Sequence, residues 1–295
     1  MAEDQTGSTV PRRQLGRNLK ELRNRAHLTV RAAAKKLEWS EAKMWRIETG
    51  RTALRSLDVQ AMCLLYGAPP DLTEMLMSLA KETKARGWWH AFGDAVTEGF
   101  NVFAGLEEAS HNLAIYETDL IPGQFQTEDY AREIIRTHVR GINEVELDGR
   151  LRLRMGRQVR QTRAMDPPVL RVVLDESALR RPIGGTEVMA RQLAHLVYVA
   201  GLPNISIRVV PFAAGMHSGM VTGPFVILRF PVTGEGFETE PPIVYSDGYT
   251  GSLYLDKEWE VEQYDAAFVD IWKASLDEQA SRRLISEVAG SYENG

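Results

Sequence analysis

The segment that decides the fold is residues 28–51, LTVRAAAKKLEWSEAKMWRIETGR. Thr29 precedes one short helical pattern, VRAAAKKL, and Ser40 precedes a second, EAKMWRIE; Thr and Ser both cap helix N-termini. Only Glu38 and Trp39 join the two patterns, and Gly50 ends the second one. Because so tight a turn sets two short helices at a steep angle, the segment predicts a helix-turn-helix.

Two further helices are predicted on either side of this motif. Apolar residues at Leu15, Leu19 and Leu22 fall on one helical face, which predicts a helix over about residues 14–26. A fourth helix starts at Ser56, and its predicted inward residues are Leu57, Ala61, Leu64 and Leu65. The single cysteine, Cys63, is interpreted as a buried small hydrophobe, and it excludes both an intramolecular disulfide and a multi-cysteine metal site.

Charge is distributed unevenly along the chain. The net charge is −5 over 295 residues, but residues 12–66 contain 13 Lys and Arg against 5 Asp and Glu, or +8. Residues 67–295 therefore carry −11, once the −2 of residues 1–11 is included. A basic module on an acidic chain favours a polyanion-binding head, with a solvated basic face as the alternative.

The order of these residues resembles the helix-turn-helix of Xre-family regulators, which are related to phage repressors. The matching positions are Leu28, Thr29, Ala34, Leu37, Ser40, Met44, Arg46, Ile47, Glu48, Gly50, Arg51 and Leu57. The resemblance implies sequence-specific binding of double-stranded DNA, binding as a homodimer, and an internal ion pair between Arg23 and Glu48. Two positions depart from the family pattern. Glu38 stands where a glycine is usual in the turn, and Val30 replaces a glutamine that contacts phosphate.

The exposed N-terminal part of a recognition helix faces the base edges of the major groove. This selects Glu41, Ala42, Lys43, Trp45 and Arg46, together with the capping residue Ser40, as candidate DNA contacts. Lys43 and Arg46 match guanine acceptors, whereas Trp45 is equally suited to packing between helices. Arg31, Arg51 and Arg55 are better placed for phosphate. For each candidate base contact the alternative is a phosphate contact or a solvated side chain.

The remaining chain predicts a larger mixed α/β (α+β) domain behind the N-terminal all-α helix-turn-helix domain. Runs rich in β-branched residues predict strands at VLRVVLD, ISIRVVP, PFVILRF and PIVYS, and a helix, EVMARQLAHLVYVA, separates the first two. GLEEASHNLAIYE and TEDYAREIIRTH are interpreted as helices. The arginine-rich stretch 150–163 is interpreted as a helix that forms internal ion pairs or extends the DNA footprint. The predicted boundaries are a disordered tail at 1–11, the DNA-binding domain at 12–68, a connecting helix at 69–89, a regulatory domain at 90–285 and a tail at 286–295.

Segments across about residues 87–285 resemble the domain that follows this helix-turn-helix in many actinobacterial regulators. They include YETDLIPGQFQTEDYAR, LDESALRRPIGG and VYSDGYTGSLYL. The resemblance implies a module that senses a small molecule or a small partner protein. The aromatic cluster at Trp88, Trp89 and Phe92 is interpreted as core, with an interdomain or dimer contact as the alternative.

Catalysis has little support in the sequence. His217, Ser218 and an acid are the residue types of a catalytic triad. However, the sequence contains no nucleophile elbow, dinucleotide motif or phosphate loop. Its 6 histidines show no metal-ligand spacing. We therefore expect no enzyme, no cofactor and no metal. His217, Asp247 and Tyr249 are instead candidate contacts for a ligand or partner. The lack of a signal peptide and of long apolar runs predicts a cytoplasmic protein that does not bind membranes. The alternative function is an antitoxin-like interaction module whose DNA binding is secondary.

Overall fold

The structure is a computed structural model that describes residues 9–83, 98–162, 166–232, 239–249 and 251–293. The chain divides into two compact units. The first contains residues 1–93, 100–109 and 232–240, and the second contains residues 94–99, 110–231 and 241–295. The predicted aromatic cluster at Trp88, Trp89 and Phe92 lies outside the described residues.

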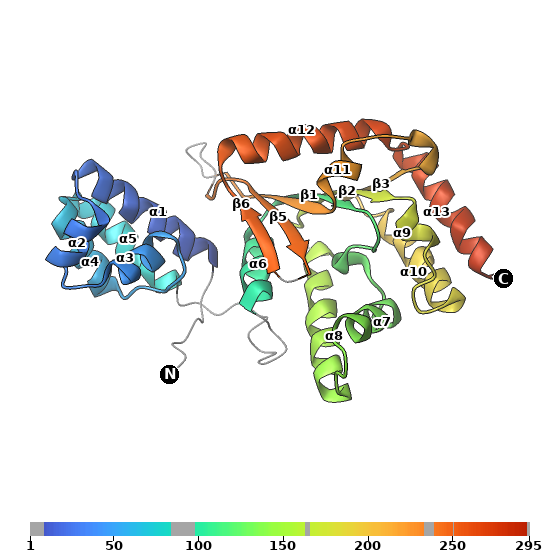
Figure 1. The fold of residues 1–295 in the computed structure, drawn as a ribbon, viewed down its shortest axis with the longest axis horizontal. Coiled ribbons are helices and arrows are strands. Elements are labelled where there is room, and N and C mark those ends of the chain that lie inside the picture. The colour runs from blue at the N-terminus through green and yellow to red at the C-terminus, as the bar shows by residue number, and fades with distance from the viewer. Residues whose placement is uncertain (1–8, 84–97, 163–165, 233–238, 250, 294–295) are drawn as a thin grey trace. The chain divides into compact units, whose positions relative to one another are not determined.

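The first unit is built on five helices, labelled in Figure 1: α1 (Thr9–Arg25), α2 (Val30–Lys36), α3 (Glu41–Glu48), α4 (Ser56–Tyr66) and α5 (Pro70–Glu82). They enclose one apolar core that includes Leu15, Leu19, Met44 and Ile47. Helix α1 starts at Thr9, and Val10 is buried, so residues 9–11 belong to the fold rather than to the predicted disordered tail. The four predicted helices are confirmed.

The predicted inward face of α4 was wrong. In α4 the buried residues are Val59, Met62, Cys63 and Tyr66, whereas Leu57 is 70% exposed and Leu64 is 84% exposed. Helix α5, in the predicted connecting segment 69–89, packs onto the same unit, because its Leu76 and Ala80 are completely buried in the core. The burial of Cys63 is confirmed.

The second unit is a sheet covered by helices on both faces. Its described strands are β1 (Asn112–Glu117), β2 (Val169–Asp175), β3 (Ile205–Val210), β4 (Phe225–Arg229), β5 (Ile243–Gly248) and β6 (Gly251–Leu255), in the order β3-β2-β1-β4-β5-β6. Strands β1, β2 and β3 are parallel, and β4 runs antiparallel to β1 and β5. The predicted mixed fold with four of these strands is therefore confirmed.

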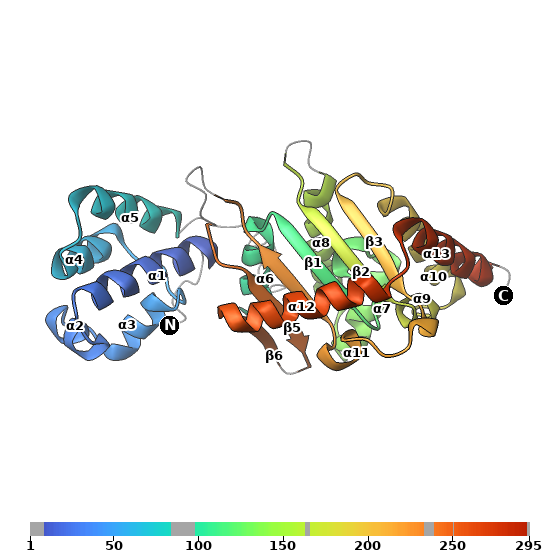
Figure 2. The same ribbon diagram turned by 90° about the horizontal axis from the view of Figure 1, so that it is seen from above.

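Residues 100–109 of α6 (Glu98–Ala109) belong to the first unit. The remaining helices are α7 (Glu128–His138), α8 (Glu144–Gln158), α9 (Ser177–Arg180), α10 (Thr186–Val199), α11 (Gly219–Thr222), α12 (Glu258–Ala274) and α13 (Glu278–Glu293). Figure 2 shows α12 crossing one face of the sheet, while α7, α8 and α10 lie on the other. Residues of α12 such as Phe268 and Ile271 pack against Tyr116 and Phe225. The segment NLAIYE is strand β1 and not part of the predicted helix, because its backbone is paired with strands on both sides.

Candidate nucleic-acid interface and ligand-contact residues

Helix α3 has one buried face and one exposed face. Met44 and Ile47 are buried in the core of the first unit. Glu41, Ala42, Trp45 and Arg46 are exposed, and Lys43 is half-buried beside them. Along the eight residues of α3, exposed positions three or four residues apart lie on the same face, so these side chains form a single surface.

Local hydrogen bonds fix where α2 and α3 begin and how the chain turns between them. Thr29 Oγ1 accepts from the amide of Ala32, and Ser40 Oγ accepts from the amide of Lys43, each at 3.1 Å. In the turn, Glu38 adopts a left-handed conformation with φ of 57°. Gly50 ends α3 with φ of 68°, and a Cβ there would lie 2.7 Å from Arg13 Cα, so only glycine fits. The predicted caps and turn are confirmed.

A buried ion pair joins α1 to the end of α3. Arg23 Nε donates to Glu48 at 2.6 Å and Arg23 Nη2 donates to its second oxygen at 2.8 Å. A third bond runs from Arg23 Nη1 to the carbonyl of Leu28 at 2.7 Å. These contacts confirm the pair expected by resemblance, and they tie the loop before α2 to the same guanidinium. The planar guanidinium thus sets the position of α3 relative to α1.

Cationic side chains gather around α3, and several have an aromatic or acidic neighbour. Lys43 Nζ lies 3.5 Å from the centroid of the Trp39 ring, and Arg51 Cζ lies 4.5 Å from that of Trp45. Arg31 is exposed on α2. Arg55 differs from the others because it donates to Asp58 at 3.1 and 3.2 Å. This acid was missed, although its spacing of three residues from Arg55 at a helix start is a sequence signal.

The structure also shows a carboxylate inside the first unit that the sequence did not point to. Glu240, whose side chain is fully buried, accepts from Arg13 Nε at 3.0 Å and from Arg17 Nη2 at 2.7 Å. Arg17 Nη1 also contacts it. Two arginines of α1 that contribute to the basic charge are therefore neutralised within the unit.

The candidate ligand contacts of the second unit do not meet at one place. His217 is buried against the face of the sheet that α12 covers, where its ring lies edge-on to Tyr116 at 6.2 Å and its Nδ1 accepts from the amide of Gly219. Asp247 is on the opposite face and accepts from Ser252 at 2.9 Å. Tyr249 is 89% exposed, next to the ring of His138.

Comparison with protein families gives two matches. Residues 14–76 match a helix-turn-helix domain, and residues 100–287 match a domain of unknown function, DUF5753. The second match covers more than half of the chain. The protein belongs to the DUF5753 family. Neither the curated proteins nor the solved structures give a match to the chain. The helix-turn-helix match supports DNA binding and a role in regulation.

In the glycine-rich loop of the DUF5753 domain, Ser218 is bonded to Asp270 and not to the neighbouring His217. Ser218 Oγ donates to Asp270 Oδ2 at 2.6 Å and its amide donates to the same oxygen at 2.9 Å, which lowers the pKa of Asp270. A Cβ at Gly219 would lie 2.4 Å from the Tyr116 ring, so this glycine permits packing of the loop on the sheet.

The arginine-rich stretch of the DUF5753 domain mostly faces inward or forms pairs. Arg150 donates to Glu146 at 2.9 Å, Arg154 donates to Gln126 Oε1 at 2.6 Å, and Arg160 donates to the carbonyl of Ser110. Arg152 is exposed, and Arg163 lies outside the described residues. The interpretation as internal contacts thus holds for Arg150, Arg154 and Arg160. Among the described residues we find no cluster with metal-ligating geometry and no helix long and apolar enough to cross a bilayer.

Proposed function

We propose that the protein is a transcription regulator of the Xre type that inserts α3 into the major groove of a specific operator. The observation that carries the proposal is the exposed surface of α3, in which Glu41, Ala42, Trp45 and Arg46 face solvent while Arg23 and Glu48 hold the helix from behind. A rigid helix whose side chains are free to contact base edges has the geometry that direct readout requires.

Within this proposal the side chains on and around α3 are assigned to base or phosphate contacts by their position and chemistry. Arg46 and Lys43 read guanine acceptors, Glu41 accepts from cytosine, and Ala42 meets a thymine methyl. Arg31 and Arg51 contact phosphate, as does Ser40 at the start of α3. Arg55 binds phosphate at the expense of its bond to Asp58, so we expect it to contribute less than Arg51.

The exposed face of α4 supports the proposal that the regulator binds as a homodimer. Leu57 and Leu64 are seven residues apart, so they lie on the same helical face, and both are mostly exposed. Apolar side chains exposed in this way are typical of a surface that another chain covers. Light scattering on wild type and on Leu64→Glu tests this, with a dimer expected for wild type and a monomer for the variant.

Operator selection from random DNA tests the function directly, because it yields both the sequence and the half-site spacing. With the selected operator, we expect Arg46→Ala to weaken binding by about 10-fold or more, since a bidentate contact to a base contributes about 1–3 kcal/mol. Lys81→Ala, which removes the same charge from an exposed site on α5, is the matched control and should bind nearly as wild type. Equal weakening in both variants would contradict specific readout, and binding insensitive to salt would contradict the proposed phosphate contacts.

We further propose that the DUF5753 domain senses an effector, either a small molecule or a small protein, and has no catalytic activity. The bond from Ser218 to Asp270, rather than to His217, supports a structural role for this loop. An antitoxin-like module would instead co-purify with a partner chain and keep that partner after Arg46→Ala.

A further inference from the structure

Strand β1 is the boundary between the parallel and the antiparallel parts of the sheet. From β1 the chain crosses to β2 on one side, while β4 lies on the other side of β1 and runs antiparallel. In open α/β sheets, ligands bind beyond the carboxyl ends of the strands at such a switch point. The last residue of β1 is Glu117.

Glu117 is mostly buried, yet it has no hydrogen bond or ion pair in the part of the chain that the structure describes. It shares the side of the sheet away from α12 with Asp247, since Ile115 and Tyr245 each pair with Val226 and both acids lie two residues further on. Burial, followed by the charges of Asp247 and Asp119, raises the pKa of Glu117 to about 8. A carboxyl group that is partly withdrawn from water, lacks a donor and lies near other acids is suited to receiving a cation.

A guanidinium with unused donors comes from α8 on the same side of the sheet. Only Nη1 of Arg154 forms a hydrogen bond among the described residues, to Gln126, although a guanidinium carries five N–H donors. Burial and the neighbouring Arg157 and Arg150 lower its pKa to about 10. The phenol of Tyr130 is within electrostatic range of both Arg154 and Glu117. Its oxygen accepts from the amide of Ile121, which leaves its proton available to a ligand.

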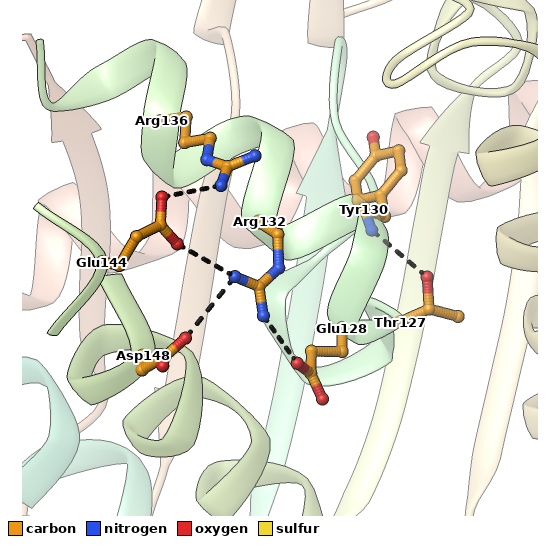
Figure 3. A network of polar contacts seen from close by, with 7 residues as sticks. All are labelled: Thr127, Glu128, Tyr130, Arg132, Arg136, Glu144 and Asp148. Carbon is orange, nitrogen blue, oxygen red and sulfur yellow. Dashed lines mark hydrogen bonds and ion pairs between the residues drawn. The ribbon is translucent and has the colours of Figure 1, made fainter. Parts of the chain in front are cut away.

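The elements that carry these groups are held in place by polar contacts. Gln192 bridges the carbonyl of Phe125 and the amide of Thr127, each at 2.7 Å, and Gln158 donates to the carbonyl of Gln126 at 2.6 Å. Figure 3 shows how Arg132 of α7 connects to Glu128, Glu144 and Asp148, which joins α7 to α8. These bonds hold α7, α8 and the loop before α7 in place. They do not involve Glu117 or the remaining N–H donors of Arg154.

We propose that Glu117 and Arg154 form the two ends of a recognition site for a small zwitterionic metabolite, whose ammonium binds the ionised form of Glu117, with release of its proton to solvent, and whose carboxylate binds Arg154. Tyr130, which interacts electrostatically with both residues, is a further donor. The inference rests on the proposed sensing function and names the chemistry of the effector. It also explains why a buried carboxyl is kept without a partner, at a cost in stability that ligand binding returns.

Thermal unfolding of the full chain tests the site with named probes. The panel contains the twenty amino acids together with β-alanine, 4-aminobutyrate and 6-aminohexanoate, which increase the separation of the two charges. At about a hundred times its Kd, a member that binds should raise the Tm of wild type by about 5 °C. Its N-acetyl and methyl ester forms, which each lack one charge, should give no shift.

Three variants decide whether the shift belongs to this site. Glu117→Gln and Arg154→Met should abolish it, while Arg152→Met, an exposed arginine on the same helix, should retain it. If Glu117→Gln fails to fold, Arg154→Met still decides the question. No shift across the whole panel, or a shift that persists in both site variants, overturns the proposal. Because the assay contains no DNA, its failure is distinct from failure of operator binding.

Discussion

Two buried carboxylates of the helix-turn-helix unit differ from Glu117 of the sheet unit in whether they have hydrogen-bond partners. Glu48 and Glu240 of the first unit each accept from arginine side chains. Glu117 of the second unit has no partner among the described residues. A paired charge fixes a geometry, as α3 requires, whereas an unpaired one remains able to bind another molecule. In this comparison the pairs at Glu48 and Glu240 are complete within the fold, whereas Glu117 is the residue that our proposal assigns to a ligand.

The largest effect is expected when a paired carboxyl is removed. Glu48→Gln leaves the buried Arg23 without its counter-charge, and we expect a loss of about 3–5 kcal/mol in the free energy of unfolding measured with urea. Glu21→Gln breaks an exposed pair with Arg25 and should cost no more than about 0.5 kcal/mol. A loss below about 1 kcal/mol for Glu48→Gln would mean that the pair does not hold α3 in place.

A smaller effect, which depends on pH, is expected for the unpaired carboxyl. Because the pKa of Glu117 is raised from 4.5 to about 8, the folded state binds a proton that the unfolded state has lost between these values. Stability should therefore fall by about 2–4 kcal/mol as pH rises from about 5 to 8, then level off. Glu117→Gln removes this slope, while Glu262→Gln, an exposed residue of α12, keeps it. Parallel pH profiles for wild type and Glu117→Gln would show that the carboxyl is fully solvated.

The smallest effect is expected in the first unit, where an unfavourable backbone conformation, and not a charge, lowers the stability. Glu38 has φ of 57°, a conformation that costs an ordinary side chain about 1 kcal/mol and glycine almost nothing. Glu38→Gly should therefore raise stability by about 1 kcal/mol in thermal unfolding. Glu74→Gly in the middle of α5 is the opposite control and should lower it by a similar amount. An unchanged or lower Tm for Glu38→Gly contradicts a strained turn.

In the first unit, the sequence alone predicts those features that depend on a single residue, such as a helix cap. Thr29 and Ser40 act through hydrogen bonds to amides three residues away, so the sequence alone locates the helix starts. The buried face of α4 was not predictable, because SLDVQAMCLLY is apolar on most sides and Leu64 looks as suitable for the core as Cys63. Only packing against the other helices selects the face.

The second unit was less accessible to sequence reasoning. Strand β1 is six residues long and apolar on both faces, so its pattern does not distinguish it from a helix; the pairing with β2 and β4 decides it. For the same reason Glu117 was missed, since it was assigned to a helix and its lack of a partner is a property of the fold. Asp247 was among the predicted contacts, a prediction that the structure does not test, and its neighbours in space could not be predicted.

The contact of Glu240 with Arg13 and Arg17 has a practical consequence for dividing the protein. The segment 232–240 belongs to the helix-turn-helix unit, although the strands on either side of it, β4 and β5, are neighbours in the sheet. No single cut separates the two units, because a fragment that ends at residue 93 lacks the carboxylate that neutralises the two arginines of α1. Such a fragment carries more positive charge than the same helices have in the full chain. Its affinity for DNA would overstate that of the intact regulator.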